Sequence, residues 1–183
     1  MIRILACIFF LVHLVSCVSI QPRQLSLAEE LIDAFYSFDS GLLRSKLSAA
    51  GGSIPFIVYY QGWAEGGNYE IAERLSCVDV GPNAVNCSIT VRDDPTLALG
   101  IDFKVTDTFH IALSDGKITS VKTSSNDLQV YLDAANWVRR ELPELIMEPC
   151  KGFFAGGPTP AACARAMTTG YGKFAASEDF PKM

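Results

Sequence analysis

Positive charge is scarce in this chain of 183 residues, and nowhere is it concentrated. Lys and Arg number 15 against 20 Asp and Glu, which gives a formal net charge of -5 at pH 7. Proteins that bind nucleic acid need clustered Lys and Arg to neutralise phosphates. Because the sequence has no such cluster, we expect no nucleic acid among its partners. Hydrophobic residues make up 49%, so the chain is too apolar to be disordered, and its length suits one domain.

Several catalytic signatures are also missing. The chain has two histidines, His13 in the apolar start and His110 in a predicted strand, so multi-histidine metal sites and most histidine-dependent nucleophiles lack their parts. The sequence contains no Gly-x-Ser-x-Gly elbow, no phosphate-binding Gly-x-x-x-x-Gly-Lys and no dinucleotide fingerprint after a strand. We therefore expect neither a metal nor a cofactor.

No apolar run reaches the roughly 20 residues that a membrane-spanning helix needs. The longest, residues 4–15, follows a short positive start, which is typical of a secretory signal peptide, placed here at residues 1–19. Leu14-Val-Ser-Cys17 is similar to the lipobox of bacterial lipoproteins, so Cys17 is a lipidation candidate. Ordinary cleavage between Cys17 and Gln21 is the alternative. Both predict an extracytoplasmic protein that is secreted, periplasmic or lipid-anchored, with membrane contact only through an N-terminal lipid.

Four of the six cysteines follow the predicted signal peptide, and an even number in an exported chain indicates disulfides. Four cysteines allow three pairings. We favour Cys77 with Cys87, across a hairpin whose turn is residues 81–83, and Cys150 with Cys163, around a loop rich in Gly and Pro. A four-cysteine zinc site is the alternative, but it prefers close Cys-x-x-Cys spacings, which are absent.

The periodicity of apolar residues predicts helices, then strands, then helices. The expected helices cover about residues 26–37, 39–51, 55–66, 124–143 and 159–170, and the expected strands cover 69–80, 84–93, 100–112 and 117–123. Ser26 and Glu29 form a capping box for the first helix, and Asp39 can cap the second. Pro143 and Gly170 are expected to end the last two helices.

Apolar and polar residues alternate along 84–93, which indicates an antiparallel sheet with one buried face. The apolar stripes of the N-terminal helices are the natural cover for that face. We therefore predict an α+β fold with helices packed on one side of a curved antiparallel sheet.

The order of these elements carries a family resemblance. N-terminal helices joined at Asp39-Ser-Gly-Leu42, a short aromatic helix, and four strands ending in the hairpin of residues 109–118 resemble the nuclear-transport-factor-2-like superfamily, which includes SnoaL-like and ketosteroid-isomerase-like proteins. The resemblance covers residues 27–126 and implies a cone-shaped domain, placed at 20–126, with a pocket for a small apolar molecule. Residues 127–183 lie outside it, as a helical, disulfide-closed extension.

The resemblance also implies where catalytic groups would stand. Ketosteroid-isomerase-like sites use a tyrosine on the first helix, a carboxylate base and a protonated acid on an inner strand face. Leu31 stands near the tyrosine position, and residues 49–56 contain no carboxylate. Asp107 shares strand parity with Val105 and Phe109, so it points inward unless a bulge turns it into a surface residue. Asp107 is the single catalytic candidate.

An aromatic cluster on the helices can line the pocket or simply fill the core: Phe35, Tyr36, Tyr59, Tyr60 and Trp63. From it and the inner strand face we take as ligand-binding candidates Phe35, Tyr60, Trp63, Asp107 and Phe109.

The sequence favours a non-catalytic protein that binds a small ligand or serves as an accessory protein. An oligomeric state is compatible with this prediction. The first alternative is a SnoaL-like or isomerase-like enzyme (isomerase, cyclase or dehydratase) using acid–base catalysis. The second is a protein-interaction module acting through the outer sheet face or the extension. Convergent polar groups in the interior would favour catalysis, an apolar cavity would favour binding, and a filled interior would favour interaction.

Overall fold

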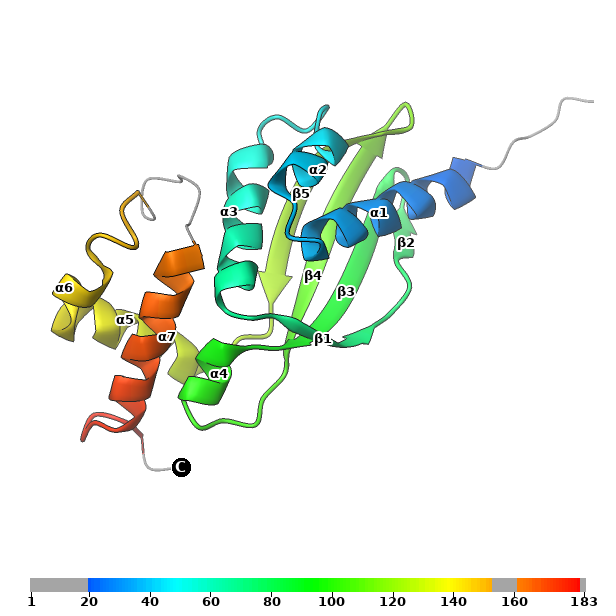
Figure 1. Cartoon of the computed structure of the whole chain (residues 1–183). Helices are drawn as coiled ribbons and strands as arrows, with labels where there is room; N and C mark the ends of the chain where they lie inside the picture. Colours follow the sequence, from blue (N-terminus) through cyan, green and yellow to red (C-terminus); the bar gives the residue numbers. More distant parts are fainter. Residues whose placement is uncertain (1–19, 153–160, 182–183) are drawn as a thin grey trace, which may run out of the picture.

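A computed structural model describes residues 20–152 and 161–181 of the chain (Figure 1). In chain order its elements are α1 (Ile20–Tyr36), α2 (Ser40–Lys46), α3 (Ile54–Gly66), β1 (Glu70–Arg74), β2 (Val78–Gly81), β3 (Ala84–Arg92), α4 (Asp94–Ala98), β4 (Val105–Ser114), β5 (Lys117–Ser125), α5 (Gln129–Glu141), α6 (Pro143–Ile146) and α7 (Ala161–Ala175). The predicted signal peptide with Cys17, and the predicted start of the last helix at residue 159, lie outside the described residues.

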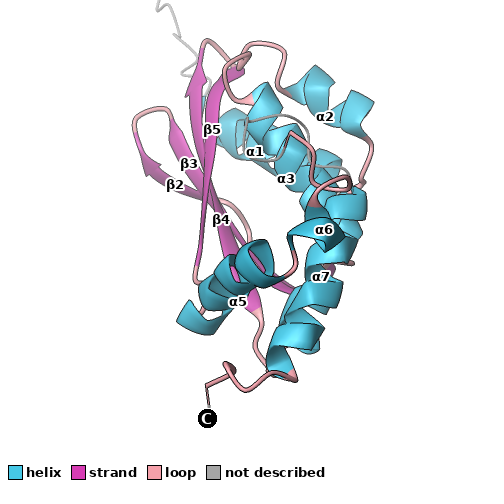
Figure 2. Ribbon diagram, turned by 90° about the vertical axis from the view of Figure 1, so that its left-hand side faces the viewer, coloured by secondary structure: helices cyan, strands magenta, loops and turns pink. Residues whose placement is uncertain are grey.

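The fold is α+β, as the sequence predicts, with an open antiparallel sheet of order β1-β3-β4-β5, in which β2 also pairs with β3. Buried and half-buried residues alternate along β3 from Ala84 to Val91, because one face of the strand packs against helices. Figure 2 shows α1, α2 and α3 on that side of the sheet. Their apolar faces and the inner face of the sheet form the first hydrophobic core.

A second core lies beside the first and joins the C-terminal helices to α3 and α4. Trp63 of α3 and Leu99 after α4 are buried in it together with residues of α5, α6 and α7. Gly170 lets α7 approach α5 closely, because a Cβ atom at this position would lie 2.5 Å from Val138 Cγ2. The extension predicted at 127–183 therefore shares α3 with the rest of the molecule, rather than standing apart from it.

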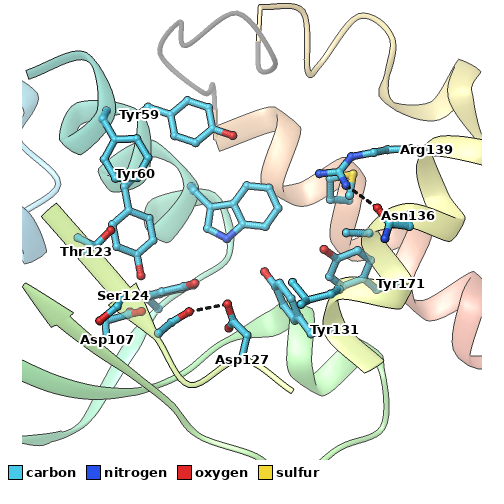
Figure 3. A pocket seen from close by; sticks show the side chains of 17 residues that line it. Tyr59, Tyr60, Asp107, Thr123, Ser124, Asp127, Tyr131, Asn136, Arg139 and Tyr171 are labelled. Carbon is cyan, nitrogen blue, oxygen red and sulfur yellow. Dashed lines mark hydrogen bonds between the residues drawn. The ribbon is translucent and has the colours of Figure 1, made fainter. Parts of the chain in front are cut away.

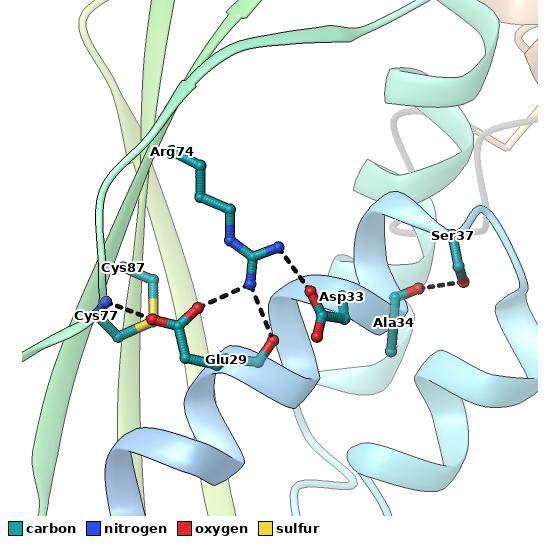
Figure 4. A network of polar contacts seen from close by, with 7 residues as sticks. All are labelled: Glu29, Asp33, Ala34, Ser37, Arg74, Cys77 and Cys87. Atoms are coloured by element: carbon teal, nitrogen blue, oxygen red, sulfur yellow. Dashed lines mark hydrogen bonds and ion pairs between the residues drawn. A yellow bond between two sulfur atoms is a disulfide. The ribbon is translucent and has the colours of Figure 1, made fainter.

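The predicted capping box of the first helix is wrong. Helix α1 already begins at Ile20, so Ser26 lies in its interior, where its backbone N–H belongs to the helix. Glu29 turns instead toward the sheet, where its Oε2 lies 2.7 Å from Arg74 Nη2 and its Oε1 accepts the Cys77 backbone N–H at 2.6 Å (Figure 4). Arg74 also pairs with Asp33 at 2.6 Å. These contacts fasten α1 to the segment between β1 and β2.

Helix α2 forms as predicted at its start and ends earlier than expected. The Asp39 carboxylate accepts the backbone N–H groups of Gly41 and Leu42 at 2.9 and 3.0 Å, which caps the helix. Leu43 and Leu47 are buried, as expected from their spacing. The helix stops at Lys46, and turns cover the stretch before α3.

The strand boundaries differ from prediction in two places. The expected strand 69–80 is two short strands, β1 and β2, whose pairings with β3 both shift register. The expected strand 100–112 begins only at Val105, because residues 101–104 form a loop without regular structure; the short helix α4, which was not expected, precedes it. Asp93 caps α4 by accepting the Thr96 N–H at 2.7 Å, and Pro95 stands in its first turn.

The C-terminal helices also differ in their ends. Leu132, expected on the buried stripe of its helix, is 46% exposed. Pro143 begins α6 rather than simply closing α5, because proline is favoured in the first turn of a helix. Helix α7 continues through Gly170 to Ala175, since Gly170 is needed for contact with α5 and not for a stop.

Both predicted disulfides are present. Cys77 and Cys87 join β3 to the segment before β2 with Cα atoms 4.3 Å apart, and Cys150 and Cys163 join the turn after α6 to α7 with Cα atoms 4.6 Å apart. Two disulfides indicate an oxidising, extracellular environment. Among the described residues, every helix is too short or too polar to cross a membrane.

Candidate functional site

A pocket of about 470 Å³ opens where the β4–β5 hairpin meets α3, α5 and α7 (Figure 3). Seven of its 17 lining residues are aromatic, and polar groups lie at both ends. The lining residues are Phe56, Tyr59, Tyr60, Trp63, Tyr69, Asp107, Thr123, Ser124, Ser125, Asp127, Tyr131, Leu132, Ala135, Asn136, Arg139, Met167 and Tyr171.

Asp107 stands on the inner face of β4, as strand parity predicts. Its neighbours across the ladder are Ile89 of β3 and Ser125 of β5, and no bulge interrupts β4 at this point. The side chain is 1% exposed, and its Oδ2 has no hydrogen-bond partner among the described residues. A buried carboxyl oxygen without a partner is energetically costly, and such groups concentrate at functional sites.

Burial raises the pKa of Asp107 to about 7, from the usual 3.8 of an aspartate in water. The negative charges of Asp127 and Asp93 raise this pKa as well, whereas a hydrogen bond from the Tyr60 hydroxyl to the carboxylate lowers it. At neutral pH Asp107 is therefore a mixture of acid and carboxylate. A small change in its surroundings is enough to shift that mixture.

Tyr60 reaches Asp107 from the opposite wall, α3. Its ring is supported from behind by Phe35 at 5.2 Å and by Phe109 at 6.2 Å between ring centroids. Phe35 and Phe109, expected as ligand contacts, are instead core residues with no exposed surface, because they stack on each other at 4.9 Å under the tyrosine. Of the expected ligand-binding residues, Tyr60, Trp63 and Asp107 line the pocket.

Tyr36 of α1 approaches Asp107 from the first core. Burial and the negative charge of Asp107 raise the pKa of its phenol. The Tyr36 hydroxyl is buried and has no hydrogen-bond partner among the described residues, although it does not line the pocket. Two tyrosines, Tyr36 and Tyr60, thus stand near the same carboxyl group.

The remaining phenols lie against one another. The rings of Tyr131 and Tyr171 meet edge to face with centroids 5.2 Å apart, and those of Tyr60 and Tyr69 do so at 6.5 Å. Burial raises the pKa values of Tyr69 and Tyr131 well above the usual value for a phenol. Both phenols are therefore neutral at physiological pH.

Charge is distributed unevenly along the pocket. In Figure 3, Asp107 and Asp127 lie at the lower end, where the Ser125 hydroxyl donates to Asp127 at 2.5 Å. Asn136 and Arg139 of α5 lie at the other end, where Arg139 Nη1 donates to Asn136 Oδ1 at 3.1 Å. The positive charge of Arg139 acts on Tyr59 and Tyr171, whose phenol pKa values burial nevertheless raises.

The sequence did not reveal one whole wall of this pocket. Tyr131, Asn136, Arg139 and Tyr171 belong to helices placed outside the pocket-bearing domain, and their role follows only from the packing of α5 and α7 against α3. One signal was available: Tyr131, Ala135 and Arg139 are spaced four residues apart, so they share one face of a helix.

Comparison of the chain with protein-family models, curated proteins and solved structures finds no match. Among residues 20–152 and 161–181, no three or more His, Cys, Asp or Glu side chains gather as a metal site would require. The geometry of the pocket itself therefore carries the functional argument.

Proposed function

We propose that this protein binds one small molecule in the pocket between the β4–β5 hairpin and helices α3, α5 and α7. The observation that carries the proposal is the unpartnered Oδ2 of Asp107, which is buried at the wall of a cavity of about 470 Å³. Aromatic walls with a few polar groups at set positions are usual in small-molecule sites, whose volumes run from about 300 to 1,000 Å³. An open cavity argues against a molecule whose interior is filled and which acts only through its surface.

We further propose that the fold is a nuclear-transport-factor-2-like cone. Helices α1 to α3 covering one face of a curved antiparallel sheet support this, as does an inward carboxyl group on an inner strand. In this proposal α5 and α7 close the wide end of the cone, so the C-terminal extension is part of the binding site.

The two disulfides support export to an oxidising compartment. We propose that residues 1–19 direct it and that processing occurs at Cys17, with lipidation, or between Cys17 and Gln21, without it. The intact mass of the exported protein distinguishes the two: a chain that starts at Cys17 and carries a diacylglyceryl group is a lipoprotein, and a chain that starts later is not.

Native mass spectrometry of protein purified from its exporting host tests the binding proposal. We expect the folded protein to carry a non-covalent adduct that denaturation removes. Thr123→Trp should remove the adduct, because the indole fills the pocket from β5. Lys122→Trp is the matched control, since Lys122 is the preceding residue on the same strand and lies outside the pocket lining. An adduct that survives Thr123→Trp, or its absence from wild-type protein, would contradict the proposal.

An acid–base enzyme is the second candidate, and one observation favours it. Asp107 has a pKa of about 7 and accepts a hydrogen bond from Tyr60, so it can both take and give a proton near neutral pH. Asp107→Asn would then abolish turnover of the bound molecule while retaining the adduct. If the protein only binds its ligand, wild type and Asp107→Asn should both release the adduct chemically unchanged.

A further inference from the structure

The uneven charge of the pocket points to the kind of molecule that it binds. We propose that the ligand is a small organic cation whose ammonium group lies between Asp107 and Asp127, against the aromatic walls. The inference rests on the proposed function, because it assigns a ligand class to the same pocket.

Negative charge at this end of the pocket has no counterpart in the described protein. Asp93, Asp107 and Asp127 lie close enough together that the charges of Asp93 and Asp127 both act on Asp107. None of the ion pairs among the described residues involves any of the three. A bound cation would supply the missing positive charge, and the attraction is strongest at Asp107, which is buried, whereas Asp127 is exposed at the pocket mouth.

The unpartnered oxygen of Asp107 is the second, independent observation. Its Oδ2 is buried, lines the pocket and accepts no hydrogen bond from the described residues. An ammonium group, whether it donates an N–H or acts through its charge alone, stabilises a carboxylate in this position. A ligand that is itself an anion would instead meet two carboxylates.

The aromatic walls complete the site. Tyr60, Trp63, Tyr69 and Tyr131 all line the pocket, and a cation is attracted to the face of such rings.

The pH dependence of binding follows from the groups around Asp107. The titratable or charged side chains that face it are Tyr36 of α1, Tyr60 of α3, Tyr69 before β1, Asp93 after β3 and Asp127 before α5. Burial raises the pKa values of the three phenols, which are therefore neutral. A cation prefers the ionised form of Asp107, so its binding should strengthen as the pH rises through about 7.

Choline and its neutral isostere 3,3-dimethyl-1-butanol test the inference, because they share a shape and differ in charge, and the choline charge does not titrate. Binding is measured by isothermal titration to the full exported protein. We expect choline to bind at least about tenfold more tightly than the alcohol at pH 8, and about tenfold more tightly at pH 8 than at pH 6. Asp107→Asn should remove the pH dependence and reduce the preference for choline, because Asp127 and the aromatic rings remain. Asp115→Asn, the same change in the distant β4–β5 turn, should change neither.

Equal binding of the two probes, tighter binding of the alcohol, or a preference for choline and a pH dependence that Asp107→Asn leaves undiminished would overturn the inference. Failure of both probes to bind would also overturn it. The proposed function is judged separately, by the adduct and its loss in Thr123→Trp, so the two can fail independently. A neutral ligand that accepts a hydrogen bond from protonated Asp107 would show the opposite trend and weaken above pH 7.

Discussion

Asp107 affects the stability of the folded state through its protonation. Its pKa is raised from 3.8 to about 7, so between these values the folded protein holds a proton that the unfolded chain has released. Stability linked to this group is therefore full below about pH 4, falls as the pH rises, and is lost above about pH 7. The difference amounts to about 4 kcal/mol at most.

We predict that Asp107→Leu stabilises the protein at pH 8 and does so less at pH 5, because it removes a buried charge that only the higher pH creates. Urea unfolding of both proteins at the two pH values measures this. Asp133→Leu, an exposed change on α5, is the control and should shift stability by less than about 0.5 kcal/mol at either pH. If the difference in stability between wild type and Asp107→Leu is the same at pH 8 and at pH 5, the assigned pKa is contradicted.

The inward direction of Asp107 was predictable, because side chains alternate strictly along a strand and Val105 and Phe109 share its parity. The residues that surround Asp107 were not predictable. Tyr60 lies 47 residues before it and Asp127 lies 20 residues after it, and no local pattern fixes which residues of α3 meet β4. The same limit made Phe35 and Phe109 look like ligand contacts when they support Tyr60 from behind.

Among the elements, α7 depends on glycine for packing rather than for a turn. Gly170 faces Val138 of α5, whose Cγ2 and Cγ1 would lie 2.5 and 2.7 Å from a Cβ atom. Gly172, two residues later, has its nearest such neighbour, the Ala98 carbonyl oxygen, at 3.9 Å. One helix thus offers a crowded and an uncrowded glycine.

We predict opposite effects for alanine at these two positions. Gly170→Ala should destabilise the protein by about 1 to 3 kcal/mol, because α5 and α7 must separate. Gly172→Ala should stabilise it by about 0.5 to 1 kcal/mol through helix propensity alone. Chemical denaturation of the two variants beside wild type measures both. Equal effects of the same sign would show that the close contact with Val138 does not exist.

Element by element, the alternation along β3 and the hairpin signals located β3 and β5 to within two residues, whereas β4 was expected to begin five residues too early. Helix α4 was missed because five residues give no periodicity, although Asp93 and Pro95 are a helix start. The stretch 69–80 looked like one strand, since a pattern of apolar residues does not show that β1 and β2 pair with β3 in different registers.

At the scale of the whole molecule, two cores meet along α3, and the second one holds a wall of the pocket. The Cys150–Cys163 disulfide fastens α6 to α7 within this second core. The Cys77–Cys87 disulfide belongs to the first core. Each core therefore has a covalent link of its own.

We predict that replacing both Cys150 and Cys163 by Ser lowers the free energy of unfolding by about 3 kcal/mol, as expected for a loop of this length. It should also weaken retention of the adduct, because α7 carries Tyr171. The matched double change at Cys77 and Cys87 should destabilise by a similar amount but leave the adduct less affected, since neither lines the pocket. Urea unfolding measures the stability of the two variants, and native mass spectrometry measures how much adduct each one retains. Equal loss of the adduct in both would contradict this division.

The α+β class was predictable because it follows from local periodicity summed along the chain. The place of the C-terminal helices was not, because it depends on contacts such as Gly170 with Val138 that join distant segments. The sequence pattern divides the chain at residue 127, but residues from both sides of that boundary line the same pocket.

The two tryptophans of the chain give the pocket a built-in optical probe. Trp63 lines the pocket, whereas the Trp137 indole N–H donates to Asp179 at 2.7 Å and its ring lies 5.5 Å from that of Phe174, away from the pocket lining. Trp137→Phe therefore leaves Trp63, in the pocket lining, as the single tryptophan. If the pocket binds a small molecule as proposed, the emission wavelength and quenching of Trp63 report its occupancy in solution, without a label and before the ligand is identified.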